Sequence, residues 1–482
     1  MIVQENTPKR GPDSKDDPNT GSQEAASGSS QPPLPPPMYS YTAPPVQPYQ
    51  NTYQPYTPEP YVVQSESTFK RFWKAFGIAV TIWFLFAVFT ESMFEVGSYG
   101  RSRLGWSGDQ AGWPTPADGI VRRCISGSEW SEYIDNPTWS HFPHGAETTF
   151  ELPVDSDALF FLTRGNWNAG IVKIVNSEIV KDTADVTVRA HFYYQSALDR
   201  ATLCLLKRGE DEQGVGIFTP RNWYPHGQQD RVQFEVTISL PASSDDEPLR
   251  IKSFESDASL YAHEIGDLQK SVYFNAISVR TSNVPISAKS IFADKGKFKS
   301  SNAPIKGTFN TSTSLELITS NAPIEVEAGL LNDDASSPTE ATFKTSNSPI
   351  ESSFSLQSEY LTGGAFKVSA RTSNGHIDLS HATSPVNSIL NLSARTSNAP
   401  AFVSLHGAYE GDYTLDTSRL APTVVKSNTL DPSGRGRRRV VEQTTQRKGH
   451  LKGSVYWQPR GVGAQSSQVE VKTSNSPIKL SV

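Results

Sequence analysis

The chain has 482 residues, of which 36% are hydrophobic, and a formal net charge of −6. This length suffices for more than one domain, and the slightly acidic balance argues against nucleic-acid binding, which favours a basic surface. Only two cysteines occur, with no C-x-x-C pair, so a cysteine-based zinc site is excluded.

Residues 1–69 are polar at first and then rich in proline and tyrosine, without a periodic apolar face. They cannot bury enough surface to offset the entropy of ordering, which predicts a disordered cytosolic tail with polyproline II character. Within the tail, Pro36, Pro37, Met38 and Tyr39 resemble the PPxY ligand of WW domains, in which a preformed polyproline helix docks on an aromatic groove. A merely solvated tail is the alternative, because four-residue motifs arise by chance.

Residues 72–94 are the longest apolar stretch, with no charged residue from Ala75 to Thr90. At about 1.5 Å per residue the uncharged part spans roughly 24 Å, so Lys74 and Glu91 would have to reach the interface of a core about 30 Å thick. The stretch is apolar on every side and predicts a single transmembrane signal-anchor helix. A buried core helix is the alternative, which the strand patterns in the rest of the chain disfavour.

Basic residues precede the uncharged part of this segment, at Lys70, Arg71 and Lys74, and two glutamates, Glu91 and Glu95, follow it. The positive-inside rule then predicts a cytosolic N-terminus, with the larger C-terminal part outside the cell or in a secretory or vacuolar lumen. The N-glycosylation sequons at Asn310 and Asn391 are compatible with that side.

Residues 95–146 are rich in glycine, tryptophan and proline and predict a juxtamembrane stalk or wrapping segment. Strand-like alternation follows, for example at 185–192 and 231–240, so residues 147–268 are expected to form a β-rich module. This module is either a β-sandwich or the first coils of the repeat domain. We expect it to cap that domain, because an open end would expose unpaired strand edges.

Cys124 and Cys204 lie on the oxidising side in this topology. A disulfide between them would close a loop of 204 − 124 = 80 residues and stabilise the fold by about 4 kcal/mol in the chain-entropy treatment. Two buried thiols are the alternative. The only close histidine pair, His141 and His144, encloses a proline that disfavours helical display of two metal ligands.

From residue 269 onward a six-residue motif recurs, most clearly as T-S-N-A-P-I at 319–324, with a decayed copy at 417–422. The motif asparagines are Asn283, Asn302, Asn321, Asn347, Asn374, Asn398 and Asn475. The first six are separated by 19, 19, 26, 27 and 24 residues, and a period in the twenties indicates a solenoid.

Apolar and polar residues alternate on both sides of the motif, which predicts a corner between two short strands. Asparagine tolerates the left-handed conformation and can bond its own backbone, and proline opens the next strand without needing an amide donor. Stacked in register, asparagine would lie over asparagine and isoleucine over isoleucine. The expected fold is therefore all-β, a β-solenoid over residues 269–482, in which Ile324 is buried and Glu325 faces solvent.

The longest insertion between copies lies before Asn475 and carries Arg435 and Arg437–Arg439. We expect it to project from one face as an exposed, flexible loop. Contact with an anionic polymer or phosphate, and cleavage by a dibasic-site processing protease, are two sharper hypotheses for the same residues.

The T-S-N-x-P-I copies resemble the family named "putative adhesin", which comprises β-solenoid surface proteins of bacteria and fungi; the copies lie at 281–286, 300–305, 319–324, 345–350 and 473–478. Tail, single span and repeats together resemble fungal single-pass membrane proteins of that type. The resemblance implies a surface scaffold without an assigned activity or cofactor.

The resulting prediction is a non-enzymatic, single-pass membrane protein that displays an adhesin-like binding or structural ectodomain. The sequence shows no His-Glu-x-x-His motif and no nucleophile elbow, and it indicates no catalytic, cofactor-binding or metal residue. The alternative is a membrane adaptor whose PPxY tail recruits a WW-domain ubiquitin ligase. A polysaccharide-active enzyme is a remote alternative.

Overall fold

The computed structural model describes residues 114–133, 142–243, 247–418, 420–459 and 467–482. The chain divides into two compact units, Met1–Leu104 and Gly105–Val482, and all described residues belong to the second. The predicted WW ligand and the predicted transmembrane segment therefore lie outside the described residues. Within the described part, no helix is long and apolar enough to cross a membrane.

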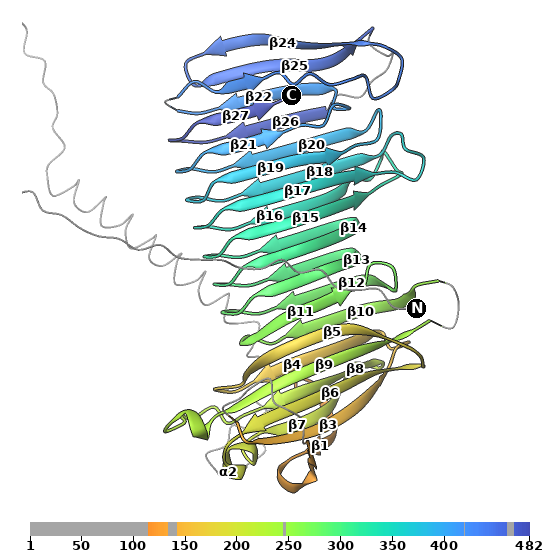
Figure 1. Ribbon diagram of the computed structural model, residues 1–482, viewed down its shortest axis with the longest axis vertical. Coiled ribbons are helices and arrows are strands. Elements are labelled where there is room, and N and C mark those ends of the chain that lie inside the picture. Colours follow the sequence, from red (N-terminus) through yellow and green to blue (C-terminus); the bar gives the residue numbers. More distant parts are fainter. Residues whose placement is uncertain (1–113, 134–141, 244–246, 419, 460–466) are drawn as a thin grey trace, which may run out of the picture. The chain divides into compact units, whose positions relative to one another are not determined.

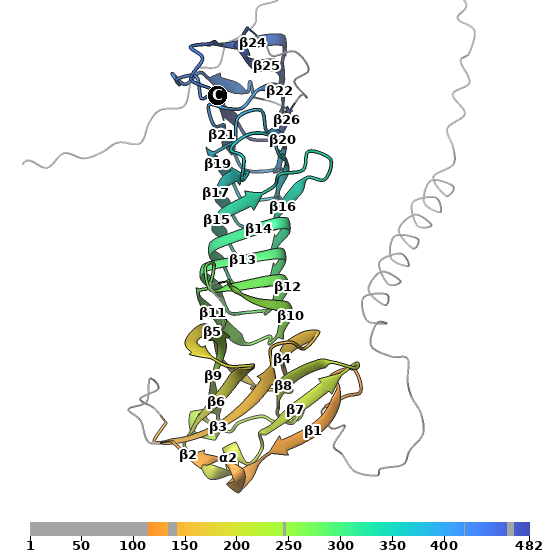
Figure 2. The same cartoon turned by 90° about the vertical axis from the view of Figure 1, so that its right-hand side faces the viewer.

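The described part is an all-β fold, as predicted, with strands that stack one above another (Figure 1). The short exceptions are the helix α2 (Gln195–Leu198) and two 3-10 turns at Gly127–Glu129 and Gln228–Asp230. The strands form two facing layers, which Figure 2 shows side by side. Two long strands, β13 (Ile286–Lys299) and β14 (Ile305–Ile318), bend so that their first halves join one layer and their second halves the other.

The first layer contains fifteen strand segments in spatial order: β1 (Ile120–Ile125), β7 (Thr202–Arg208), β8 (Glu212–Phe218), β4 (Ala158–Arg164), β10 (Leu249–Asp257), β12 (Val272–Arg280), the second halves of β13 and β14, β16 (Thr339–Lys344), β18 (Ala365–Arg371), β20 (Ile389–Arg395), β26 (Ser467–Lys472), β22 (Gly411–Asp416), β25 (His450–Gln458) and β24 (Arg438–Arg447).

The second layer contains, in the same spatial direction, β2 (Ser131–Glu132), β3 (His144–Pro153), β6 (Thr183–Phe192), β9 (Val232–Ala242), β5 (Ala169–Val180), β11 (Tyr261–Asp267), the first halves of β13 and β14, β15 (Ile324–Leu331), β17 (Ile350–Gln357), β19 (Ile377–Thr383), β21 (Ala401–Ser404), β27 (Ile478–Ser481) and β23 (Thr423–Val425).

Strand direction changes along both layers. The strands at the N-terminal end, β1–β7–β8 and β2–β3–β6–β9, pair antiparallel, whereas parallel pairing begins with β4 and β5 and continues into the repeats. Parallel stacking therefore starts well before residue 269, where the sequence patterns place the repeat domain. Strands β1 and β2 lie in the 95–146 segment, in which the sequence analysis expected a stalk or a wrapping segment.

From β12 onward each turn of the chain, called a coil below, contributes one strand to each layer. The repeated isoleucines pair in register, with Ile305 opposite Ile324 and Ile324 opposite Ile350. Ile324 is completely buried, whereas the side chain of Glu325 is 40% exposed and forms an ion pair with Lys306. The predicted inward and outward alternation is thereby confirmed.

The core lies between the layers and runs without a break along the stack. Its members in the coils include a series of fully buried phenylalanines: Phe274, Phe298, Phe309, Phe343, Phe354 and Phe366. Because each coil is only two short strands, its inward side chains are covered mainly by those of the coils above and below.

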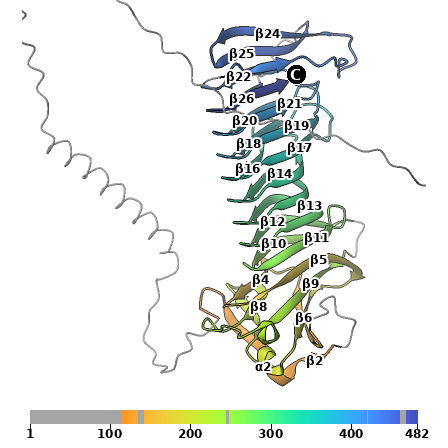
Figure 3. The same ribbon diagram turned by 60° about the vertical axis from the view of Figure 1, so that its left-hand side comes forward.

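The C-terminal coil, β26 and β27, lies between two coils that precede it in the sequence (Figure 3). It pairs on one side with β20 and β21 and on the other with β22 and β23. The long insertion therefore forms strands and closes the end of the stack, which corrects the expectation of a loop projecting from one face. Alternating inward residues such as Tyr413 and Leu415 are the reason, because they continue the core.

Candidate functional site

The repeated motif forms the corner at which each coil passes from the first layer to the second. At each corner the amide of one asparagine donates to the side-chain oxygen of the asparagine in the coil before, as Asn321 Nδ2 does to Asn302 Oδ1 at 2.7 Å. This ladder joins all seven predicted corner residues, Asn283, Asn302, Asn321, Asn347, Asn374, Asn398 and Asn475, at distances of 2.6 to 2.9 Å.

Asparagine occupies these corners for a reason other than the expected tolerance of the left-handed conformation. None of the seven corner asparagines, all of them within the described residues, has a positive φ. The corner is closed instead by the residue before the motif serine, since Thr319 Oγ1 accepts the backbone N–H of Ala322 at 3.3 Å. Asparagine is required for the ladder, because its amide can donate to one neighbour and accept from the other.

Thr417 and Ser418, the first two residues of the decayed copy, occupy the next corner of the stack. Ser418 donates its backbone N–H to the carbonyl of Ser474, and Thr417 Oγ1 donates to the carbonyl of Ser476. Asn475 in turn donates to Asn398, 77 residues earlier in the chain. The ladder thus passes through the inserted C-terminal coil and not along the sequence.

The two predicted glycosylation residues lie in different environments. Asn391 is exposed on β20, whereas Asn310 on β14 is partly buried and its Nδ2 donates to the backbone carbonyl of Ile291 at 3.2 Å. A glycan attached to Asn310 would have to leave from an amide held inside the strand layer. Of the two sequons, Asn391 is therefore the better glycosylation candidate.

Cys124 and Cys204 form a disulfide and are not two buried thiols, the alternative that their positions in the sequence also allowed. The two residues are directly opposite each other in the antiparallel pair β1–β7. The bond ties the edge strand β1 to the layer. Of the histidine pair, His141 lies outside the described residues, and the ring of His144 stacks on Phe192 with centroids 5.7 Å apart.

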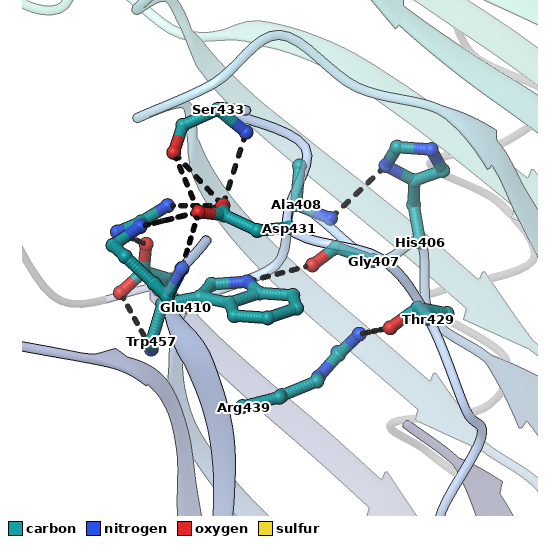
Figure 4. Close-up of polar contacts among 10 residues, drawn as sticks. His406, Gly407, Ala408, Glu410, Thr429, Asp431, Ser433, Arg439 and Trp457 are labelled. Atoms are coloured by element: carbon teal, nitrogen blue, oxygen red, sulfur yellow. Dashed lines mark hydrogen bonds and ion pairs between the residues drawn. The ribbon is translucent and has the colours of Figure 1, made fainter. Parts of the chain in front are cut away.

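A cluster of polar side chains lies in the insertion, beside β24 and β25 (Figure 4). Arg437 binds Glu410 at 3.0 Å and Asp431 at 3.1 Å, and only 12% of its side chain and 4% of that of Asp431 are exposed. Burial alone would raise the pKa of Asp431, but hydrogen bonds from Arg437 and Ser433 outweigh it and hold this pKa well below its ordinary value.

Trp457 anchors the cluster from β25. Its indole nitrogen donates to the carbonyl of Gly407 at 3.0 Å, and its backbone N–H donates to Glu410 at 3.1 Å (Figure 4). The guanidinium carbons of Arg437 and Arg439 lie 5.8 and 5.6 Å from the centre of its ring. Arg437 is therefore an internal tie and not the solvent-exposed cation that the run of arginines predicts.

Arg439 differs from Arg437 because its charge has no direct ion pair among the described residues. Its Nη1 donates to Thr429 at 2.7 Å, whereas Nε and Nη2 are buried without a hydrogen-bond partner. Burial lowers the pKa of Arg439, and the charge of Glu410 opposes this effect. The Nε–Nη2 edge has the geometry that binds a carboxylate or phosphate through two oxygens. Arg435 and Arg438 are exposed beside it.

Histidines enter the core below this cluster, a feature that sequence reasoning missed because isolated histidines carry no periodic signal. The ring of His381 stacks on Phe354 with centroids 4.8 Å apart and lies 5.7 Å from His406. Burial lowers the pKa of His381 to about 3, with a further contribution from His406. Burial likewise lowers the pKa of His263 to about 4.

Carboxylates line one outer face of the coils, where Glu325, Glu351 and Asp378 are in register on neighbouring strands. Lys306 and His376 contact two of them, at 2.7 and 3.0 Å. Over the described ranges, no group of three or more His, Cys, Asp or Glu side chains has the arrangement needed to hold a metal ion.

No protein-family model matches the chain, and no curated protein sequence is similar to it. One similar solved structure is a "putative cell adhesion protein" from Clostridium sporogenes, with 7% identity and a TM-score of 0.16 over 70% of this chain and 99% of that one. Another is a "putative adhesin" from Parabacteroides merdae, with 8% identity and a TM-score of 0.31 over 69% of this chain and 95% of that one. Likenesses this remote identify neither a family nor a ligand.

Proposed function

We propose that this chain is a non-enzymatic, single-pass membrane protein that displays an adhesin-like β-solenoid as a binding or structural ectodomain. The observation that carries the proposal is the asparagine ladder together with the in-register isoleucines. The repeated asparagine and the repeated isoleucine both contact their counterparts in the neighbouring coils. The repeats therefore serve as a scaffold, and binding falls to the residues that are not repeated.

Membrane display is supported by the uncharged stretch from Ala75 to Thr90 and by the basic residues before it. Protease added to sealed microsomes should remove only the N-terminal tail, while the two-layer fold stays protected. Digestion of the two-layer fold under the same conditions would reverse the orientation. Resistance to extraction by alkaline carbonate tests the span separately, because a peripheral protein would be released.

A second function, a membrane adaptor, is favoured by one observation, the sequence from Pro36 to Tyr39. A peptide with this sequence should bind isolated WW domains at micromolar concentration through a preformed polyproline helix. Tyr39→Ala should abolish the binding, and a proline substitution elsewhere in the tail serves as the control. Equal binding by the Tyr39 variant would remove the support for an adaptor.

A further inference from the structure

A groove with a volume of about 640 Å³ opens beside β5 and β9, in the part of the fold that precedes the repeats. Its lining includes three aromatic residues and four polar ones: Phe142, Trp167, Tyr193, Gln228, Gln229, Arg231 and Gln233. None of the residues that line the groove is a carboxylate or a lysine. The groove therefore combines flat apolar surfaces with neutral hydrogen-bonding groups and a single cation.

The aromatic rings are held partly open to solvent. Trp167 is 40% and Tyr193 is 37% exposed, although large aromatic side chains usually bury more of their surface. Trp167 has a φ of 56°, a left-handed conformation that is strained for a bulky residue. Strain of this kind persists where the surrounding structure imposes it, and it is concentrated at ligand-binding sites.

The next residue, Asn168, is firmly held. Its buried amide donates to the carbonyl of Ile217 at 2.8 Å, and its side-chain oxygen accepts the hydroxyl of Tyr261 at 2.5 Å. These contacts fix the backbone beside Trp167 to both layers. The indole is thus presented by a rigid support and not by a free loop, which reduces the entropy lost on binding.

The polar groups are also oriented. The hydroxyl of Tyr194 donates to Gln229 Oε1 at 2.9 Å, which leaves the amide nitrogen of Gln229 as a donor for the groove. The guanidinium of Arg231 lies over one face of the Trp167 ring, 4.6 Å from its centre, and its N–H groups are further donors in the lining. Neighbouring amides and a guanidinium around an aromatic surface are complementary to a ligand that carries hydroxyl groups on an apolar ring.

We propose that this groove binds a neutral carbohydrate, with the C–H face of a sugar ring against Trp167 or Tyr193 and its hydroxyls bonded to the glutamine amides. A cationic ligand would lack a carboxylate partner there. A proline-rich peptide would pack against the aromatic rings, but it has too few polar groups to pair with the three glutamine amides and Arg231. The proposal deepens the binding role of the proposed ectodomain and rests on it.

The test uses the full-length protein in lipid nanodiscs and a set of soluble oligosaccharides of glucose, mannose and N-acetylglucosamine, with binding followed by isothermal titration calorimetry. At least one series should bind with a stoichiometry of one. Trp167→Gly removes the ring and suits the positive φ, so it should fold and should weaken binding at least tenfold. Trp167→Phe should retain binding within a few-fold, and Tyr224→Ala, which alters an aromatic residue that is 71% exposed and outside the groove, should leave it unchanged.

The proposal is overturned if the wild-type protein binds none of the three series, or if Trp167→Gly binds as well as the wild type. Displacement of the sugar by a peptide of residues 31–61, or binding of that peptide alone at this groove, would instead assign the surface to polyproline. Oligosaccharide binding by purified protein does not depend on membrane orientation. A failure of the protease-protection experiment and a failure of this one are therefore distinguishable.

Discussion

The coils and the C-terminal insertion are joined to the same two layers by different means. In the coils, stability comes from many equivalent contacts, and the charged pairs between strands, such as Lys306 with Glu325, lie on the outer surface. The insertion shares the strand pairing and the core, but it also carries one cluster that is not repeated, in which Arg437, Asp431 and Trp457 are largely buried. Exposed ion pairs contribute little, whereas a buried charge that loses its partner is costly. The coils therefore distribute their stability over equivalent contacts, whereas part of the stability of the insertion depends on one buried cluster.

The largest effect should follow from placing a charge among the equivalent contacts of the coils. Ile324 is completely buried between Ile305 and Ile350. Ile324→Asp would bury a carboxylate without a partner, and it should lower the free energy of unfolding by about 4 kcal/mol or more. Thermal or urea unfolding of the purified protein measures the change.

Glu325→Ala is the matched control, one residue away and facing outward. It removes only an exposed ion pair with Lys306 and should change stability by less than about 0.5 kcal/mol. Similar unfolding transitions for the two variants would show that the inward and outward assignment is wrong.

A smaller and more local effect is expected in the insertion. Arg437→Met leaves Asp431 buried without its cation, and it should lower the melting temperature by roughly 5 °C. Because the contacts of Arg437 lie within the insertion, amide hydrogen exchange should accelerate in β24 and β25 and remain unchanged in β15 and β17. Arg435→Met, an exposed neighbour, should alter neither. Uniform acceleration along the whole stack would contradict a concentrated anchor.

The sequence predicted the coils well because the feature that repeats is also the feature that packs. The spacing of Asn302, Asn321 and Asn347 determines which residues lie above one another, and the alternation around Ile324 determines which face inward. The insertion was misjudged because its cluster unites residues as distant as Glu410, Asp431 and Trp457, whose partners no local pattern reveals. From the sequence alone, a run of arginines predicts a solvent-exposed loop. The carboxylates that pair with Arg437 are distant in the sequence, and only the structure shows them.

A buried histidine in the core of the coils should make the stability sensitive to acid, whereas an exposed histidine on their surface should not. The unfolded chain protonates His381 near its ordinary pKa of about 6.5, whereas in the folded protein burial lowers that pKa to about 3. The contribution of neutral His381 to the free energy of unfolding is thus fully present above pH 6.5. It is lost progressively as the pH falls from about 6.5 to about 3. At pH 5 the loss from His381 is about 2 kcal/mol.

His381→Phe should preserve the stack on Phe354 and remove this proton uptake. The variant is expected to match the wild type at pH 7 and to exceed it by about 2 kcal/mol at pH 5 in urea unfolding. His376→Gln, on the exposed surface, serves as the control. An unchanged difference between pH 7 and pH 5 in His381→Phe would show that this histidine does not carry the acid sensitivity.

The smallest effect concerns one step of the asparagine ladder. Asn321 donates to Asn302 at 2.7 Å and accepts from Asn347 at 2.6 Å, and all three side chains are open to water on one side. Since its backbone has no positive φ, Asn321→Ala removes these two hydrogen bonds without relieving or creating backbone strain. Water can replace part of what is lost, so the free energy of unfolding should fall by about 1 kcal/mol. Asn321→Asp keeps the shape and the acceptor but removes the donor, and it should cost more than alanine because two oxygens then face each other at Asn302. If Asn321→Asp were as stable as the wild type, the ladder would be a geometric consequence of stacking and not a contribution to it.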